Sequence, residues 1–148
     1  MNGNKASGCL VALLIVAGAL MPARAERVNE CFEAASLRYD VSQRLLEAIA
    51  SVESGGNPAA INKNANGSED IGLMQINSSW LPKLKTYGIQ RADMFDPCVS
   101  INVGAWILAD NISRHGYSWE AVGAYNAVNP SKRLDYAYKV ARVLVAGD

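Results

Sequence analysis

Residues 41–60 read VSQRLLEAIASVESGGNPAA, and this stretch decides how the rest of the chain is interpreted. Ser42 suits the N-cap of a helix, and Leu46 and Ile49 recur at helical spacing on one face. Glu53 continues that apolar face and is followed by Gly-Gly, which predicts that the helix ends beside an open polar loop. A carboxylate on an apolar face is unfavourable unless it is paired or protonated.

Two interpretations of Glu53 follow from this position. In the first, the side chain turns out to solvent or pairs with an arginine. In the second, it lies in a half-apolar cleft, where its pKa rises and it can donate a proton near neutral pH. A glycosidic oxygen needs such a donor before it can leave. Because Glu53 ends its helix against a loop that can open a cleft, we treat it as a catalytic candidate.

The remaining pattern predicts a mainly helical single domain without repeats or internal linkers. Further helices are expected over 29–40, 98–116, 118–126 and 130–147. The last of them places Tyr138, Ala141, Leu144 and Val145 along one apolar face. Residues 55–70 are rich in Gly, Asn and Pro, which predicts a polar loop with at most a small hairpin at Asn66-Gly67. The pattern of residues 72–81 leaves extended and helical structure both open.

The first 25 residues predict a secretory signal peptide, cut before Glu26. Lys5 precedes the apolar run CLVALLIVAGAL, and PARA follows with small residues at the cleavage pattern. A membrane anchor is the alternative, but spanning takes about 20 apolar residues. The expected mature domain is therefore 26–148, exported to the periplasm.

Charge and cysteine content narrow the function classes. Removing Lys5 and Arg24 from 14 basic residues leaves 12 against 14 acidic ones, which makes nucleic acid an unexpected partner. Cys31 and Cys98 remain after cleavage in an oxidising compartment, so we predict a disulfide between them. With one histidine and no CxxC pair, a metal site is not indicated, and we expect no cofactor.

Three motifs in order, AIASVESGGNPAA, GLMQI and AYNA, resemble those of lytic transglycosylases of the soluble-lysozyme-like type. The small secreted size resembles the subfamily associated with secretion, conjugation and pilus systems. The resemblance covers nearly the whole mature chain and implies a lysozyme-like fold that acts on peptidoglycan glycan strands, with Glu53 as the catalytic acid. We expect a monomer, with components of such an apparatus as further partners.

The resemblance also implies roles for individual residues around the substrate. Ser54 corresponds to the family's hydrogen-bonding partner near the catalytic site. The other positions correspond to the motifs that shape the glycan groove; they are Gly72, Met74, Gln75, Tyr125 and Asn126. Each also has a purely structural interpretation, because Met74 suits core packing, Gln75 suits a backbone contact, and Tyr125 suits a buried aromatic position.

The reaction implied by the resemblance needs only one protein carboxylate. Glu53 protonates the oxygen between N-acetylmuramic acid and N-acetylglucosamine, then acts as a base on the C6 hydroxyl of the same muramic acid. Attack of that hydroxyl on the anomeric carbon gives a 1,6-anhydro sugar. The N-acetyl group of the substrate could stabilise the cationic centre. The hydroxyl is held in place, which favours it over water.

Asp70 departs from this single-carboxylate pattern. EDIGLMQINSS is also similar to a motif of animal-type lysozymes: Asp, one residue, Gly, two residues, then Gln-Ile-Asn-Ser. In that family the Asp of the motif is the second catalytic carboxylate. Asp70 follows Glu53 by 17 positions. It is therefore a second catalytic candidate, and a hydrolytic muramidase using both acids is the alternative function. A loop acid bonded to nearby Asn side chains remains open too, as does a non-catalytic glycan-binding or assembly protein.

Three other side chains are weaker candidates. His115 precedes Gly116 at a predicted helix end and suits the helix dipole. Trp106 lies in an apolar helical pattern and is expected in the core, whereas Trp80 is equally suited to the core and to stacking on a sugar. Glu69 is expected to point away from Asp70 if the segment is extended.

Overall fold

The computed structural model describes residues 20–147, which form six α-helices, two short 3₁₀ helices and a three-stranded sheet. The α-helices are α1 (Leu20–Tyr39), α2 (Gln43–Ser54), α3 (Leu81–Lys85), α4 (Pro97–His115), α5 (Trp119–Asn126) and α6 (Pro130–Ala146). The strands are β1 (Ile61–Lys63), β2 (Glu69–Ile71) and β3 (Ile76–Asn77). Most of the predicted signal peptide lies outside the described residues, and its last residues belong to α1.

Local sequence signals account for the bounds of α2. The Ser42 side chain accepts a hydrogen bond from the Leu45 backbone N–H at 3.3 Å, which caps the first turn as predicted. At the other end, Gly55 adopts a left-handed φ of 62° and its N–H donates to the Ser51 carbonyl. The helix therefore ends at Ser54, one residue after Glu53, where the glycine-rich loop begins.

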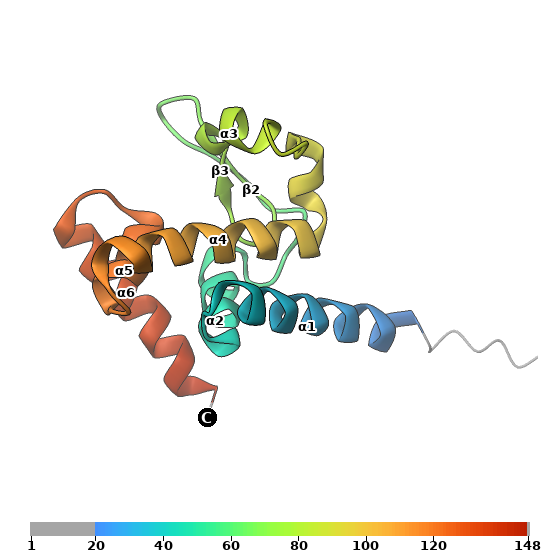
Figure 1. Cartoon of the computed structure of the whole chain (residues 1–148), viewed down its shortest axis with the longest axis horizontal. Coiled ribbons are helices and arrows are strands. Elements are labelled where there is room, and N and C mark those ends of the chain that lie inside the picture. Colours follow the sequence, from blue (N-terminus) through green and yellow to red (C-terminus); the bar gives the residue numbers. More distant parts are fainter. Residues whose placement is uncertain (1–19, 148) are drawn as a thin grey trace, which may run out of the picture.

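Helix α4 runs through the middle of the molecule (Figure 1). It packs against α1 on one side and α5 on another, while α6 packs on both α5 and α2. The sheet and α3 lie above α4 in Figure 1, on the side away from α1. The buried core joins α2, α4 and residues 71–76 beneath the sheet. The predicted mainly α, lysozyme-like fold class is confirmed.

The polar segment after α2 forms an antiparallel sheet in the order β1-β2-β3. Asp70 lies at its centre, opposite Asn62 on β1 and Asn77 on β3. The β1–β2 turn includes Gly67 at a φ of 84°, so the small hairpin predicted at this place is confirmed. Residues 72–81 change from a turn to β3 and then to the 3₁₀ helix η1 (Ser78–Trp80), which settles the choice that the sequence left open.

The disulfide prediction is confirmed, because Cys31 on α1 bonds to Cys98 in the first turn of α4. The Cα atoms of the two cysteines are 5.2 Å apart. Asp96 caps the same turn by accepting hydrogen bonds from the N–H groups of Cys98 and Val99, and Pro97 occupies the first helical position. The cross-link therefore holds α1 against a well-defined helix start.

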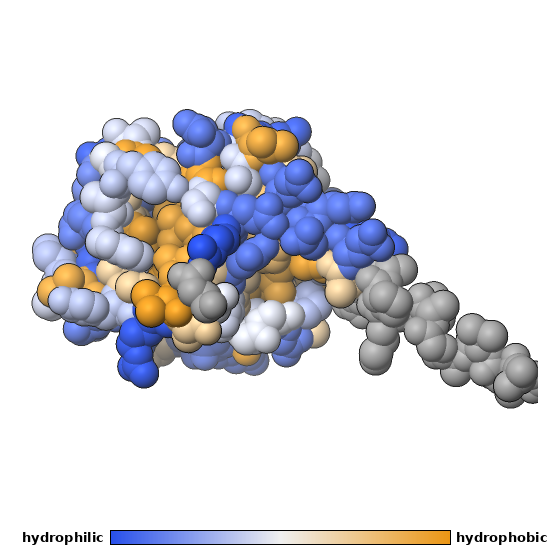
Figure 2. All heavy atoms as spheres, turned by 90° about the horizontal axis from the view of Figure 1, so that it is seen from below, coloured by the Kyte–Doolittle hydropathy of each residue, from blue (hydrophilic) through white to orange (hydrophobic). Residues whose placement is uncertain are grey.

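The predicted apolar face of α6 is only partly correct, because Leu144 packs against the core but Tyr138 and Val145 do not. Tyr138 and Val145 are 62% and 75% exposed, whereas Tyr136, Ala137 and Val140 are buried. Both sets follow helical spacing, so periodicity alone cannot choose between them. Packing against α2 and α5 selects the second set. Tyr138, Ala141 and Val145 contribute to apolar surface on the underside of the molecule, near the C-terminal end (Figure 2).

Within residues 20–147, no helix combines the length and apolar character that a membrane crossing requires.

Candidate active site

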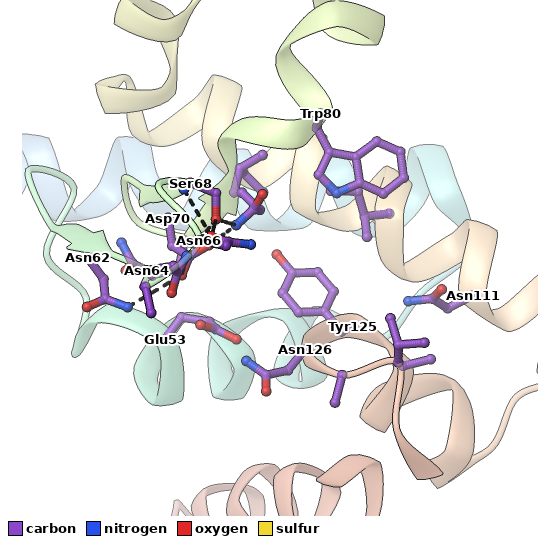
Figure 3. Close-up of a pocket in the computed structure, with 18 of the residues that line it drawn as sticks. Glu53, Asn62, Asn64, Asn66, Ser68, Asp70, Trp80, Asn111, Tyr125 and Asn126 are labelled. Atoms are coloured by element: carbon purple, nitrogen blue, oxygen red, sulfur yellow. Dashed lines mark hydrogen bonds between the residues drawn. The ribbon is translucent and has the colours of Figure 1, made fainter.

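A cleft of about 770 Å³ opens between the sheet and the helical part of the molecule. Figure 3 shows side chains from the sheet on one side of it, Glu53 below them, and Trp80 and Asn111 on the opposite side. The lining residues include Glu53, Asn62, Asn64, Asp70, Gln75, Trp80, Asn111, Arg114, Tyr125, Asn126 and Val128. The cleft therefore brings together residues from all three motifs identified in the sequence.

Glu53 is the most strongly perturbed carboxyl group in the cleft. Burial raises its pKa from the ordinary 4.5 to about 7. A hydrogen bond from Tyr136 opposes this rise, the negative charge of Asp70 adds to it, and the positive charge of Lys139 opposes it. A carboxyl group with a pKa near 7 is protonated in a substantial fraction of molecules at neutral pH. It can therefore donate a proton and afterwards accept one.

Tyr136 is the site residue that the sequence interpretation missed. Its hydroxyl donates to Glu53 Oε1 at 2.5 Å across the α6–α2 contact. Burial and the charge of Glu53 raise the pKa of Tyr136, so the hydroxyl remains a proton-bearing donor. The available signal was its spacing from Val140, four residues on, which puts both residues on one helical face. The competing face through Tyr138 concealed it.

Asp70 faces the cleft and is held by three asparagine side chains. Its Oδ1 accepts from Asn77 at 2.7 Å, and its Oδ2 accepts from Asn64 at 3.0 Å and from Asn62 at 3.4 Å. Two of these partners are its cross-strand neighbours, so the sheet register fixes the arrangement. The cleft-facing position and the bonds to asparagines, which the sequence left as alternatives, therefore occur together.

Gln75 lines the cleft in a tight turn between β2 and β3. Its φ of 48° is unusual for a residue with a side chain. The side-chain Nε2 donates to the carbonyls of Gly72 at 2.9 Å and Ala60 at 3.3 Å. These bonds connect the turn formed by Gly72–Gln75, called the GLMQ turn below, to the loop that follows α2. The backbone contact considered for Gln75 is thus present at the edge of the cleft.

Ser54, Gly72 and Met74, which were predicted to contact the substrate, are not among the residues that line the cleft. The Ser54 hydroxyl donates to the Leu73 carbonyl at 2.7 Å, which joins the end of α2 to the GLMQ turn. Gly72 has a φ of 76°, and a Cβ there would overlap the Met94 carbonyl. Met74 is fully buried, and its backbone N–H donates to Ser100 Oγ at 3.1 Å. The buried side chain of Met74 matches its structural interpretation as core packing.

Tyr125 and Asn126 come from the end of α5 and border the cleft beside Glu53 (Figure 3). The Tyr125 hydroxyl donates to the Met74 carbonyl at 2.9 Å, which links α5 to the GLMQ turn. Its ring stacks on that of Tyr136 with a centroid separation of 6.4 Å. Burial raises the pKa of the Tyr125 hydroxyl, so it stays neutral.

The weaker candidates also have defined positions. Trp80 lines the cleft and meets Trp106 edge to face, with ring centroids 5.4 Å apart. Trp106 packs against the core, as expected. Glu69 points away from Asp70 and pairs with Arg91 at 2.7 Å. His115 is the exposed last residue of α4, as predicted.

Over residues 20–147, no group of three or more His, Cys, Asp or Glu side chains is arranged to hold a metal ion.

Comparison with known proteins now identifies the family. The family model "Transglycosylase SLT domain" matches residues 30–141, which include Glu53, the GLMQ turn and Tyr125. The chain belongs to this family. By family it is a peptidoglycan lytic transglycosylase.

Relatives cover most of this lytic transglycosylase. Invasion protein IagB of Salmonella typhimurium is 46% identical over 114 residues, covering 76% of this chain and 71% of IagB. Protein IpgF of Shigella flexneri is 42% identical over 118 residues, covering 76% of this chain and 78% of IpgF. A peptidoglycan-binding-like protein of Escherichia coli O157:H7 is 40% identical over 124 residues, with 76% and 74% of the two chains covered.

A solved structure agrees with the fold of this transglycosylase. An inactive mutant of lytic transglycosylase Slt from Pseudomonas aeruginosa superposes with a TM-score of 0.64 over 86% of the chain. The identity is 19%, so the similarity establishes the fold alone. The match spans 24% of the Slt chain, about a quarter of that much longer enzyme.

Proposed function

We propose that Glu53 cleaves the β-1,4 bond between N-acetylmuramic acid and N-acetylglucosamine in peptidoglycan. The carrying observation is a half-buried carboxyl group in the cleft whose pKa is raised to about 7. In its protonated form Glu53 gives its proton to the glycosidic oxygen as the bond breaks. Tyr136 stabilises the ionised carboxylate of Glu53 that remains, because its hydroxyl donates a hydrogen bond to that carboxylate.

The same carboxylate then removes the proton from the C6 hydroxyl of the muramic acid. That oxygen bonds to the anomeric carbon, and the product is a 1,6-anhydro end. No water enters the balance, and Glu53 regains its proton for the next cycle. A raised pKa suits both steps, because the free energies of the two protonation states are similar near neutral pH.

Asp70 supports this reaction through its charge in our proposal. The bonds from Asn62, Asn64 and Asn77 hold the carboxylate at the cleft, where it can stabilise positive charge at the anomeric carbon. Its position in the same cleft as Glu53 also favours a second candidate, a hydrolytic muramidase in which Asp70 is the nucleophile. The two candidates differ in product chemistry.

Mass spectrometry of the products from purified peptidoglycan separates these candidates. Anhydro ends support transglycosylation, whereas reducing ends from the wild type would establish hydrolysis instead. Glu53→Gln is nearly isosteric and should abolish cleavage, with Glu33→Gln on exposed α1 as a control that keeps full activity. Cleavage by Glu53→Gln at a rate near that of the wild type would refute the role of Glu53.

Asp70→Asn should slow the reaction while anhydro products persist. Loss of one preorganised charge contact in a catalytic site lowers the rate about 10²-fold on the scale set by oxyanion-hole deletions. The rate and the product ends are measured on the same peptidoglycan digests. An unchanged rate would limit Asp70 to holding the sheet together.

We further propose that the protein is exported through cleavage before Glu26 and opens the periplasmic cell wall locally for a secretion apparatus. The apolar N-terminal run and the small size of the domain support export. The name of one relative, invasion protein IagB, is consistent with work beside such an apparatus. N-terminal sequencing of the periplasmic protein tests the cleavage site.

A further inference from the structure

The end of the cleft away from Asp70 contains a buried amide with an unused donor. Asn111 projects from α4, and Figure 3 shows its side chain directed into the cleft, toward Tyr125. The residue is only 3% exposed. Its Nδ2 atom has no hydrogen-bond partner among the described residues. Buried polar groups in proteins are nearly always paired, so this exception needs an explanation.

The neighbouring arginine establishes which atom of the amide is unpaired. Arg114 Nη2 lies 2.6 Å from Asn111 Oδ1. Because a guanidinium group only donates hydrogen bonds, the atom that it contacts must be the amide oxygen. The other atom is therefore the NH₂ group, which can only donate. Its missing partner is an acceptor, such as a carbonyl or carboxylate oxygen.

Arg114 adds positive charge to the same end of the cleft. Its side chain is 57% exposed and lines the cleft. Nη2 makes both the bond to Asn111 and an ion pair with Asp110 at 2.7 Å. Among residues 20–147, the Nε and Nη1 N–H groups have no hydrogen-bond partner, and the two Nη2 contacts hold the guanidinium plane in place. The Asn111–Arg114 pair thus presents donors to an acceptor-bearing, anionic group.

Peptidoglycan carries such a group on every second sugar. The lactyl ether of each muramic acid leads into a peptide stem with amide carbonyls and free carboxylates. The sugar N-acetyl groups offer carbonyls too, but they carry no charge and need no guanidinium. We propose that Asn111 and Arg114 form a subsite for the lactyl–peptide stem, with Nδ2 donating to a stem carbonyl and Arg114 facing a stem carboxylate. This inference rests on the proposed function of the cleft.

Binding measurements without cleavage test the subsite. In the Glu53→Gln protein, we compare by calorimetry a soluble stem-bearing tetrasaccharide prepared from peptidoglycan with chitotetraose, which has the same N-acetylated β-1,4 backbone but no lactyl group and no stem. The protein should bind the stem-bearing form about tenfold more tightly, the factor that one charge-assisted hydrogen bond supports. Adding Arg114→Gln or Asn111→Leu should remove most of that preference. Arg91→Gln, which breaks an ion pair outside the lining of the cleft, should keep it.

Each other outcome contradicts a definite part of the proposal. Equal affinity for the two ligands, or a preference that survives both substitutions, overturns the stem subsite while leaving the proposed function intact. Equal weakening on both ligands assigns Asn111 to a sugar N-acetyl group instead and overturns the stem assignment. Failure to bind either ligand counts against the proposed function itself. If Asn111→Leu does not fold, Asn111→Asp keeps the oxygen that Arg114 contacts and replaces only the donor.

Discussion

At the scale of single residues, burial of Glu53 is unfavourable for folding stability but suits its proposed role in catalysis. The helix α2 places it on the inner face, where an ionised carboxylate loses much of its hydration. Tyr136 and Lys139 partly compensate for that loss, whereas the negative charge of Asp70 repels the carboxylate and raises its pKa further. The balance leaves a carboxyl group that exchanges its proton near neutral pH, which a residue acting as acid and then base requires.

This balance predicts that Glu53→Gln becomes more stable than the wild type as pH rises. Below about pH 4.5, Glu53 is protonated in both folded and unfolded chains, so the substitution should change little. Between pH 4.5 and 7 only the folded chain keeps the proton, and the wild type loses stability as pH rises. Above pH 7 the variant should be more stable by up to about 3 kcal/mol, because its amide carries no charge to desolvate.

Urea unfolding at pH 4.5, 6 and 8 measures this difference. Glu33→Gln on exposed α1 is the matched control and should show no comparable trend. A difference independent of pH would mean that Glu53 does not carry a raised pKa in the folded chain.

Tyr136→Phe tests the hydrogen bond that only the structure revealed. The hydroxyl bond stabilises ionised Glu53 and lowers its pKa, so removing it should raise that pKa further above 7. The alkaline limb of the kcat/KM profile against pH should then move to higher pH, while the maximal rate falls. Tyr138→Phe, on the exposed face of the same helix, should leave the profile unchanged. A lower rate with an unshifted profile would reduce Tyr136 to a packing role.

At the scale of elements, the GLMQ turn is held by side chains of neighbouring helices that form hydrogen bonds with its backbone. It connects β2 to β3. Ser54 and Tyr125 donate hydrogen bonds to the carbonyls of residues 73 and 74, and Ser100 accepts one from the N–H of residue 74. These three side chains come from α2, α5 and α4. The turn is therefore the point at which three helices position the sheet against Glu53.

Gly72→Ala should be costly for two separable reasons. The φ of 76° is unfavourable for any residue with a Cβ, at about 1–2 kcal/mol, and the new methyl group would overlap the Met94 carbonyl. Gly88→Ala is the matched control, since Gly88 has a φ of 78° but nothing within 4 Å of the added atom. Thermal unfolding should show a clearly larger loss for Gly72→Ala. Equal losses would show that the turn can move away from Met94 at little cost.

At the scale of the whole molecule, the Cys31–Cys98 disulfide connects the N-terminal helix to the central one across 67 residues. The chain-entropy model gives about 4 kcal/mol for closing a loop of that length in the unfolded state. Reduction, or Cys31→Ser with Cys98→Ser, should lower the urea midpoint accordingly, and the helical circular dichroism in water should persist. Two reactive thiols in the unreduced native protein would contradict the prediction.

The sequence by itself determined the local features and the family. Ser42 and Gly55 act through neighbouring backbone groups, so the two ends of α2 could be predicted without knowledge of the fold. The disulfide followed from two remaining cysteines, and the three motifs indicated the fold and the cleft.

Only the tertiary structure decided the contacts between distant elements. Tyr136 reaches Glu53 because α6 packs on α2 with one of two apolar faces that periodicity cannot rank. The unpaired donor of Asn111 depends on where α4 lies relative to the cleft. The physical reason is range: caps and turns depend on residues a few positions apart, whereas a pKa or an unsatisfied donor depends on every group that packing brings nearby.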